Sequence, residues 1–324
     1  MKLYKLATFT AALVAPLVAS SAEAQEFPTR PMRMIVTVSP GGGPSLAATL
    51  LSEQMGPMLG QSMVVDHRAG GGGVPGIMES LNAPADGHTL IVLDSQHWAI
   101  GPAMSPDLPY DTLRDLAPIG SVYKSVQVVV ANSNFPAKDL RELIAMAKAK
   151  PGALNFSSAG TGSGTHFAGE VFKDAAKIDV VHVPYKGIPE ALNDTMTNRV
   201  QFFMAPVASL ASLVRDGRLV SLGVTSLKRS TVYADIPTLA ESGLPGFEFE
   251  SWGGMVAPAK TPRPIITRLN REIATALAAP DTQQRMRALG AEPVSTTPEA
   301  YDLRIASEIA KIGTIARRAG ITPQ

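Results

Sequence analysis

The sequence has no cysteine, and it carries almost no excess of charge of either sign. Without cysteine the chain forms no disulfide, offers no thiolate nucleophile and has no thiol to carry a lipid. Its 29 lysines and arginines nearly balance its 28 aspartates and glutamates, so no strong field attracts nucleic acid or an anionic membrane surface. The composition therefore excludes thiol chemistry and gives no reason to expect a nucleic-acid partner.

Long apolar stretches are scarce as well. The apolar run 6–18 is too short for a stable membrane span, and it follows the basic residues Lys2 and Lys5. The small-residue site Ala22–Ala24 comes shortly after the run, and this order is typical of a secretory signal peptide. We expect residues 1–24 to be such a signal and the mature chain to be exported without membrane insertion.

What the mature chain does contain is a series of short apolar runs that alternate with helical patterns. The alternation predicts parallel sheets covered by helices on both faces, with ligands bound beyond the carboxyl ends of the strands. The predicted strands span residues 32–38, 63–66, 89–93, 126–130, 180–183, 201–204 and 219–224. The predicted helices span residues 46–58, 140–149, 166–176, 188–197, 208–215, 264–279 and 298–318.

Two familiar kinds of site match the sequence only in part. Residues Gly71–Gly76 fit the dinucleotide pattern G-x-G-x-x-G, but Pro75 removes a backbone donor from the turn that would hold the phosphates. We therefore expect no cofactor. No metal site is expected either, because paired-ligand spacing is absent from the five histidines, which are His67, His88, His97, His166 and His182.

An exported serine hydrolase is a rival hypothesis from another class of function. Ser158 and Ser163 lie close in sequence to His166, which could serve as a base. Neither serine stands at the centre of a G-x-S-x-G motif, and the spacing implies no acidic third member. The sequence therefore does not favour catalysis.

Two loops rich in glycine and hydroxyl groups remain, at Ser39–Ser45 and Ser157–Thr165. Each combines backbone N–H donors with neutral hydroxyls at the predicted start of a helix. Such donors suit a carboxylate, which needs several charge-assisted hydrogen bonds when it leaves water. The loops could equally be tight strand-to-helix turns with N-caps, and the residues alone leave both interpretations open.

Several ordered segments carry a family resemblance. The chain resembles the tripartite tricarboxylate transporter receptors, the Bug family of periplasmic solute-binding proteins, in "RPMRMIVTVSPGGG", "LPYDTLRDLAPIGSV", "VHVPYKGIPEAL" and "DIPTLAESGLPGFEFESWGGMVAPAKTP". The resemblance covers the mature chain nearly from end to end, and the ordered set is far more specific than the opening glycine loop.

The resemblance implies an α/β chain with a type II periplasmic-binding-protein fold, in which two α/β lobes enclose a ligand cleft. The expected division places residues 25–124 and 249–324 in lobe 1 and residues 125–248 in lobe 2. A monomeric receptor without enzymatic activity is implied, which passes a small carboxylate to a membrane permease of the tripartite tricarboxylate type or to a sensor.

The resemblance also implies that the two loops grip the ligand carboxylate, partly through ordered water. The role of Lys186 in "PYKG" is left open. The ligand-binding residues expected on this basis, together with neighbours of the two loops, are Ser39, Gly41, Gly42, Gly43, Ser45, Ser95, His97, Trp98, Ser158, Thr161, Gly162, Ser163, Thr165, His166, Phe167 and Tyr185.

Departures from the family pattern bear on the ligand. Ser45 stands where relatives that bind amino acids often carry aspartate, so we expect acids without an ammonium group to be preferred. Trp98 replaces a usual histidine, and Trp98 and Phe167 could form aromatic walls around a flat ring, although ordinary packing is the alternative. An aromatic mono- or dicarboxylate of the phthalate type is the leading hypothesis, and an aliphatic di- or tricarboxylate is the alternative.

Overall fold

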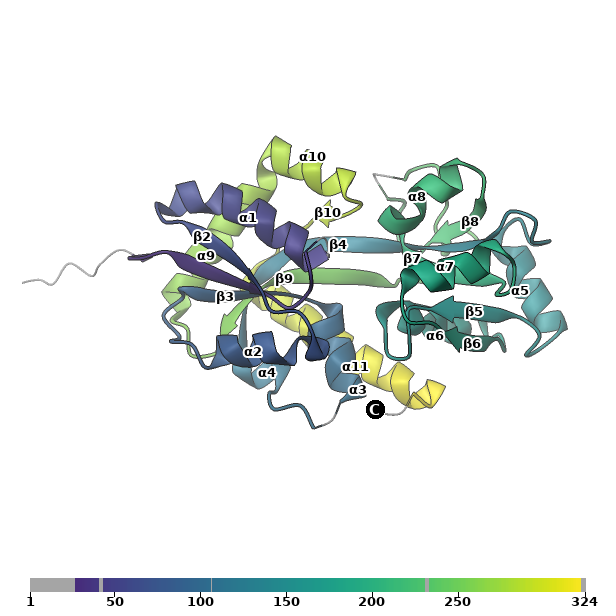
Figure 1. Ribbon diagram of the computed structural model, residues 1–324, viewed down its shortest axis with the longest axis horizontal. Helices are drawn as coiled ribbons and strands as arrows, with labels where there is room; N and C mark the ends of the chain where they lie inside the picture. The colour runs from purple at the N-terminus through teal and green to yellow at the C-terminus, as the bar shows by residue number, and fades with distance from the viewer. Residues whose placement is uncertain (1–26, 41–42, 106, 231–232, 322–324) are drawn as a thin grey trace, which may run out of the picture.

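The computed structural model describes residues 27–40, 43–105, 107–230 and 233–321, and it shows two lobes joined by long strands (Figure 1). The predicted signal peptide 1–24 and the site candidates Gly41 and Gly42 lie outside these residues. None of the described helices is long and apolar enough to cross a membrane.

Lobe 1 is built around a parallel three-stranded core. Strand β1 lies between β2 and β3 and pairs with both in parallel. The elements of lobe 1 are β1 (Met32–Val36), α1 (Gly43–Leu59), β2 (Met63–His67), η1 (Gly71–Gly73), α2 (Val74–Leu81), β3 (Thr89–Asp94), η2 (Gln96–Ile100), α3 (Gly101–Met104), α4 (Thr112–Asp115), α9 (Arg263–Ala278), α10 (Pro280–Ala288), β10 (Glu292–Pro293) and α11 (Pro298–Ala319).

Lobe 2 repeats the arrangement with β5 paired in parallel to both β6 and β7. Its elements are α5 (Leu140–Ala149), β5 (Asn155–Ser158), α6 (Gly164–Ala176), β6 (Val181–Pro184), α7 (Ile188–Met196), β7 (Phe202–Pro206), α8 (Val207–Arg215) and β8 (Leu219–Val224).

Alternating side chains of each central strand fill two separate cores. Met34 and Val36 of β1 pack in the cluster that contains α1 and α9, whereas Ile35 packs in the cluster that contains α2. All three residues are fully buried. This two-residue period is the reason that helices cover both faces of the sheet, as the sequence predicted.

Two long strands pass between the lobes. Strand β4 (Leu116–Asn132) pairs antiparallel with β9 (Glu250–Pro258) in its first half, and with β7 and β8 in its second half. The whole forms one ten-stranded sheet of order β2-β1-β3-β9-β4-β7-β5-β6, with β8 and β10 also paired to β4.

The prediction of purely parallel sheets was wrong at these crossing strands. Strand β9 brings the chain back to lobe 1 and therefore runs antiparallel to both β3 and β4. The predicted strand 126–130 is only part of β4, because Pro118 and Gly120 break the pattern and the pairing register shifts between them. The expected lobe boundaries at residues 124/125 and 248/249 fall within β4 and just before β9, and they stay a prediction.

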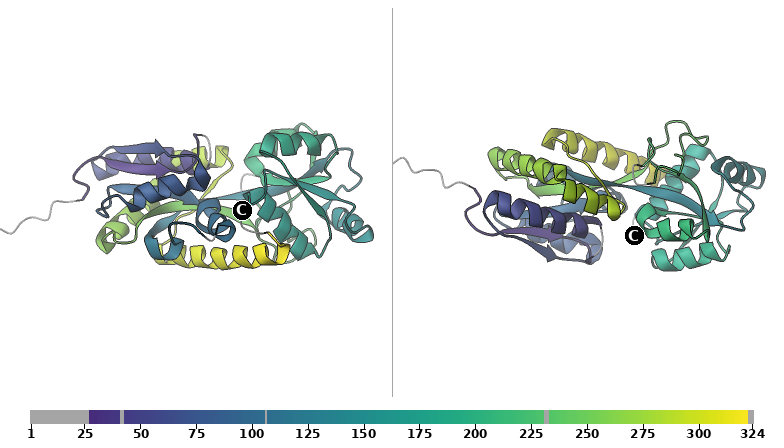
Figure 2. Two further views of the ribbon diagram at one scale, coloured as in Figure 1. Left: turned by 60° about the horizontal axis from the view of Figure 1, so that its bottom comes forward. Right: turned by 90° about the horizontal axis from the view of Figure 1, so that it is seen from above.

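Helix α11 runs along one side of the molecule from lobe 1 to lobe 2, as Figure 2 shows. Near its end it contacts α6, where the Arg318 guanidinium lies 3.3 Å from an Asp174 carboxylate oxygen. The ammonium of Lys311 donates to the carbonyl oxygen of Glu248. The helix is thus a third connection between the lobes, beside β4 and β9.

Candidate functional site

A cavity of about 300 Å³ lies between the lobes, against the crossing strands. Lobe 1 contributes residues of α1, of α10 and the segment after it, and of the end of β3, and lobe 2 contributes the junction of β7 and α8. The crossing strands β4 and β9 contribute the rest. The described residues that line it are Gly43, Leu46, Ala47, Leu50, Asp94, Tyr123, Ser125, Pro206, Ala208, Ser209, Ser251, Met286, Leu289 and Ala291. The cavity therefore lies where open α/β sheets bind ligands, beyond the carboxyl ends of their strands.

The phenol ring of Tyr123 is held between two glycines. A Cβ atom on Gly43 would lie 2.7 Å from the Tyr123 hydroxyl oxygen, and one on Gly253 would lie 2.1 Å from a ring carbon. Tyr123 is only 3% exposed, and its hydroxyl has no hydrogen-bond partner among the described residues. The hydroxyl thus lies at the cavity beside the first turn of α1.

Burial, together with the charge of Asp94, raises the pKa of Tyr123 well above its usual value. The hydroxyl therefore keeps its proton at every physiological pH and can donate a hydrogen bond. The N-terminus of α1 next to it carries unpaired N–H groups and the positive end of the helix dipole. A hydroxyl donor and a helix N-terminus facing one cavity favour an anion there.

The carboxyl end of β3 brings two predicted residues beside the cavity. The Ser95 hydroxyl lies 3.1 Å from the hydroxyl of Ser251, which lines the cavity on β9. His97 Nδ1 lies 2.8 Å from Asp94 Oδ1, which also accepts a hydrogen bond from the Gln96 amide. The two predicted residues therefore support the cavity through Ser251 and Asp94.

The G-x-G-x-x-G turn has a structural role beside His97. Gly73 adopts a φ of 83°, and a Cβ atom there would lie 2.4 Å from His97 Cδ2. The glycine therefore allows the turn to approach the imidazole and to enter α2 in a left-handed conformation.

The first predicted loop is divided between solvent and core. Ser39 is exposed, and Gly43 begins α1 at the cavity wall. Ser45 is 3% exposed, and its hydroxyl lies 2.8 Å from His67 Nε2 at the end of β2. Ser45 thus fixes α1 to β2, and its contact with ligand stays a prediction.

Most hydrogen-bonding groups of the second loop serve the loop itself. The Ser163 hydroxyl caps α6 by accepting from the His166 amide, and Thr165 Oγ1 accepts from the Ala159 amide. The Gly162 amide donates to His166 Nδ1, and the Gly162 carbonyl accepts from Gln96 Nε2 of lobe 1. These contacts hold the loop against η2.

Exposure separates the candidates of this loop. Thr161 is exposed and free to meet a ligand, whereas Ser158 is fully buried. The Ser158 hydroxyl lies 2.6 Å from His182 Nε2, on the neighbouring strand β6. The Ser158 side chain is therefore turned into lobe 2, and its contact with a ligand carboxylate stays a prediction.

The predicted aromatic walls are also corrected by the structure. Trp98 is 1% exposed and Phe167 is 0% exposed, and both pack in the largest hydrophobic core. Trp98 lies on the π-helical turn η2, which directs the run His97–Ile100 inward, and Phe167 lies on the buried face of α6. The alternative of ordinary packing was right for both residues.

Tyr185 is tied to its own lobe rather than to the cavity. Its hydroxyl donates to an Asp194 carboxylate oxygen at 2.7 Å, on α7. Burial and this hydrogen bond raise the pKa of Tyr185 to about 12. Lys186 is exposed at the same turn.

A serine hydrolase finds no support in this geometry. Ser158, which pairs with His182, is closed to solvent, and the Ser163 hydroxyl is engaged with Thr165 and the start of α6. His166, the expected base, instead accepts from the Gly162 amide. The nucleophile and base named from the sequence are therefore not brought together.

His166 and His182 stack on one another with 3.8 Å between ring centroids. Burial is the main cause that lowers the pKa of each to about 4 from 6.5, and the charge of Lys173 adds to it. The native state thus holds both rings neutral at a pH where the unfolded chain binds protons.

We therefore expect the melting temperature to fall as the pH drops from about 6.5 to about 4. Above pH 6.5 the contribution of these rings is fully present, because neither folded nor unfolded chain protonates them. The paired change His166→Asn and His182→Gln should flatten this part of the profile. Differential scanning calorimetry in steps of half a pH unit measures it, and identical slopes for both proteins would contradict the assignment.

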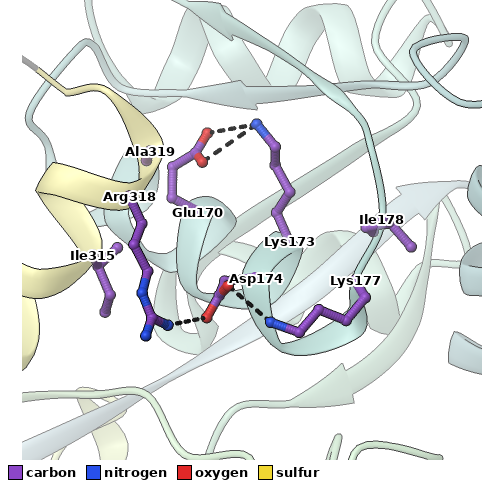
Figure 3. A pocket seen from close by; sticks show the side chains of 8 residues that line it. All are labelled: Glu170, Lys173, Asp174, Lys177, Ile178, Ile315, Arg318 and Ala319. Atoms are coloured by element: carbon purple, nitrogen blue, oxygen red, sulfur yellow. Dashed lines mark hydrogen bonds and ion pairs between the residues drawn. The ribbon is translucent and has the colours of Figure 1, made fainter.

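A second hollow, between α6 and α11, is lined by charged side chains that already pair with each other (Figure 3). Lys173 contacts Glu170 at 3.4 Å, and Asp174 contacts both Lys177 and Arg318. A charged ligand would have to break these pairs. The inter-lobe cavity, with its unpartnered tyrosine hydroxyl, is the better candidate.

Comparison with known proteins decides the family. The model of the tripartite tricarboxylate transporter family receptors matches residues 47–321. The chain belongs to this receptor family. The receptor is 38% identical over 295 residues to a UPF0065 protein from the tcbD–tcbE intergenic region of Pseudomonas sp. strain P51, covering 89% of this chain and 87% of that protein. It is 35% identical over 312 residues to BugT of Bordetella pertussis, covering 96% of this chain and 94% of BugT.

Solved structures of similar proteins confirm the fold of the receptor. The periplasmic binding protein BugD is 30% identical with a TM-score of 0.74, and covers 92% of this chain and 100% of its own. R. palustris Rpa4515 with adipate is 30% identical with a TM-score of 0.78, and the match covers 92% of this chain and 100% of that chain. MatC of Rhodopseudomonas palustris with bound malate is 28% identical with a TM-score of 0.73, and the match covers 89% of this chain and 99% of that chain. The receptor is thus a solute-binding protein of α/β architecture, and its family and fold neighbours are binding proteins rather than enzymes.

Sequence reasoning missed several residues that line the cavity. Asp94 could have been found, because it ends a predicted strand of an open sheet. Tyr123 and Ser125 lie in the part of β4 that was not predicted as a strand, and Ser251 lies on β9, which was not predicted at all. Their approach to α1 depends on pairings between distant segments.

Proposed function

We propose that this receptor captures a small carboxylate in the periplasm and delivers it to a permease of the tripartite tricarboxylate type or to a sensor. The observation that carries the proposal is the protonated hydroxyl of the buried Tyr123, which has no hydrogen-bond partner among the described residues and lies beside the first turn of α1. A carboxylate at this point would receive the tyrosine proton and the free N–H groups of the helix.

Two kinds of likeness add support. The structural neighbours crystallised with adipate and malate show that this fold binds carboxylates in related proteins. The apolar side chains of α1 and α10 in the cavity offer room for a hydrocarbon body, aromatic or aliphatic. With Trp98 and Phe167 in the core, the aromatic class rests on this apolar lining and the Tyr123 ring instead of on the two predicted walls.

Replacing Tyr123 by phenylalanine tests the proposal. We expect the dissociation constant for the best-bound acid among benzoate, phthalate, hexanoate, adipate and malate to rise about 10- to 100-fold, since a hydrogen bond to a charged group is worth about 1.5–3 kcal/mol. Isothermal titration calorimetry measures it.

Tyr233→Phe is the matched control, because that tyrosine is partly buried against the core of lobe 2 and does not line the cavity. The control should leave affinity unchanged. If Tyr123→Phe binds as tightly as the unmodified protein, the tyrosine does not hold the carboxylate and this placement of the site fails.

A further inference from the structure

The inter-lobe cavity is polar at one end and apolar along the rest of its length. Gly43, Leu46 and Leu50 line it from the same face of α1, since residues three, four and seven apart share one helix face. The wall therefore runs from the helix N-terminus for about 10 Å along α1, at a rise of 1.5 Å per residue. Moving away from Tyr123, the ligand path changes from hydroxyl and N–H groups to leucine side chains.

The opposite walls continue the apolar surface. Met286 and Leu289 contribute from α10, and Pro206 and Ala208 contribute from the start of α8 in lobe 2. The two lobes meet at this end, because a Cβ atom on Gly290 would lie 2.5 Å from the Ala208 Cβ. The lobes thus touch beside the apolar wall, where Leu289 is 42% exposed.

The charges around the cavity are of one sign. Asp94 is the one charged side chain among the described residues that line it, and none of those residues is lysine, arginine or histidine. A carboxylate at the polar end has donors from Tyr123 and α1. A second carboxylate placed against the leucines of α1 would exchange water for apolar contacts without gaining a cation, which is unfavourable.

We propose that the cavity selects a monocarboxylate with an apolar body, either a short hydrocarbon chain or a single ring, and rejects an acid that carries a second carboxylate. This rests on the proposed function, and it narrows the ligand from acids in general to acids with one charge. The leucine side chains of α1 and Met286 of α10 receive the body of the ligand.

Matched pairs of acids test the charge count alone. Hexanoate and adipate share a six-carbon chain and differ by one carboxylate, and benzoate and phthalate share a ring and differ in the same way. Calorimetry on the purified mature protein measures the dissociation constants. In each pair that binds, we expect the acid with one carboxylate to have a dissociation constant at least about tenfold lower than its partner with two.

A charge-inserting variant makes the test specific to the cavity. Ser209 is an exposed lining residue on α8, so Ser209→Arg adds a cation at the wall without disturbing the core. In this variant adipate should gain at least fivefold in affinity while hexanoate changes less than twofold. Ser209→Ala is the matched control and should keep the ratio of the unmodified protein, with melting curves confirming that both variants fold.

The outcomes separate this inference from the proposed function. Adipate or phthalate bound as tightly as its one-charge partner would overturn the selection for one charge and leave carboxylate capture standing. An unchanged ratio in Ser209→Arg would overturn the placement of the ligand body along α1. Failure of all four acids and of malate to bind would overturn both proposals together.

Discussion

Replacing Lys124 by methionine should lower the free energy of unfolding by about 3–5 kcal/mol, the range found when one partner of a buried ion pair is removed. The Lys124 ammonium lies 2.8 Å from Glu250 Oε1 and 3.6 Å from Glu292 Oε2. The Glu250 side chain is only 1% exposed, so the change would leave its carboxylate buried without its cation.

The loss should depend on pH in a defined direction. Burial already raises the pKa of Glu250 above its usual value, and Lys124 opposes this rise. Without Lys124 the pKa rises further, so at acidic pH the carboxyl takes up a proton and part of the lost stability returns. The loss should therefore be larger at pH 8 than at pH 5.5.

Urea denaturation at these two pH values measures both effects. The double change Lys124→Met and Glu250→Leu is the matched control, because replacing both partners leaves no buried charge, and it should recover most of the loss. A single variant as stable as the unmodified protein at pH 8 would show that the pair does not stabilise the junction of β4 and β9.

Replacing Gly253 by alanine should both destabilise the protein by about 1–3 kcal/mol and weaken carboxylate binding at least about tenfold. The added Cβ would lie 2.1 Å from a ring carbon of Tyr123 and 2.7 Å from its hydroxyl oxygen. The ring has little room to retreat, because Gly43 approaches the hydroxyl equally closely. Tyr123 must therefore shift, and its hydroxyl leaves the position beside α1.

Gly313→Ala serves as the control for adding a methyl group. Gly313 lies inside α11, and the nearest atom to a Cβ there is the flexible end of Arg317 at 3.5 Å. Alanine favours helix, so this variant should be as stable as the unmodified protein or more so. Urea denaturation and calorimetry on both variants measure the difference, and tight carboxylate binding by Gly253→Ala would argue against the role given to Tyr123.

Local signals explain which parts of the fold the sequence predicts well. The predicted helix 140–149 has the observed bounds of α5, because the Asp139 side chain accepts from the Glu142 amide at its start and the apolar period is regular. The predicted strand 219–224 likewise matches β8. The crossing strands were predicted poorly, since Pro118 and Gly120 make β4 look like a loop.

The site was less predictable than the fold for a physical reason. Sequence patterns place Ser95 and His97 at the end of a strand, where the structure finds them beside the cavity. They do not tell which side of a turn faces solvent, so Trp98 was placed in the cleft although it belongs to the core. Tyr123 was missed because its position depends on packing between segments far apart in the chain.

Helix α11 limits the ways in which the lobes can move. Its 22 residues span about 33 Å as a stiff rod, which is anchored in lobe 1 through the buried Tyr301 and in lobe 2 through Arg318 and Asp174. Together with β4 and β9 it gives three connections between the lobes. We therefore expect the lobes to move by shear, with α6 sliding along α11. A ligand that draws the lobes together therefore works against shear at a surface on the far side of the molecule.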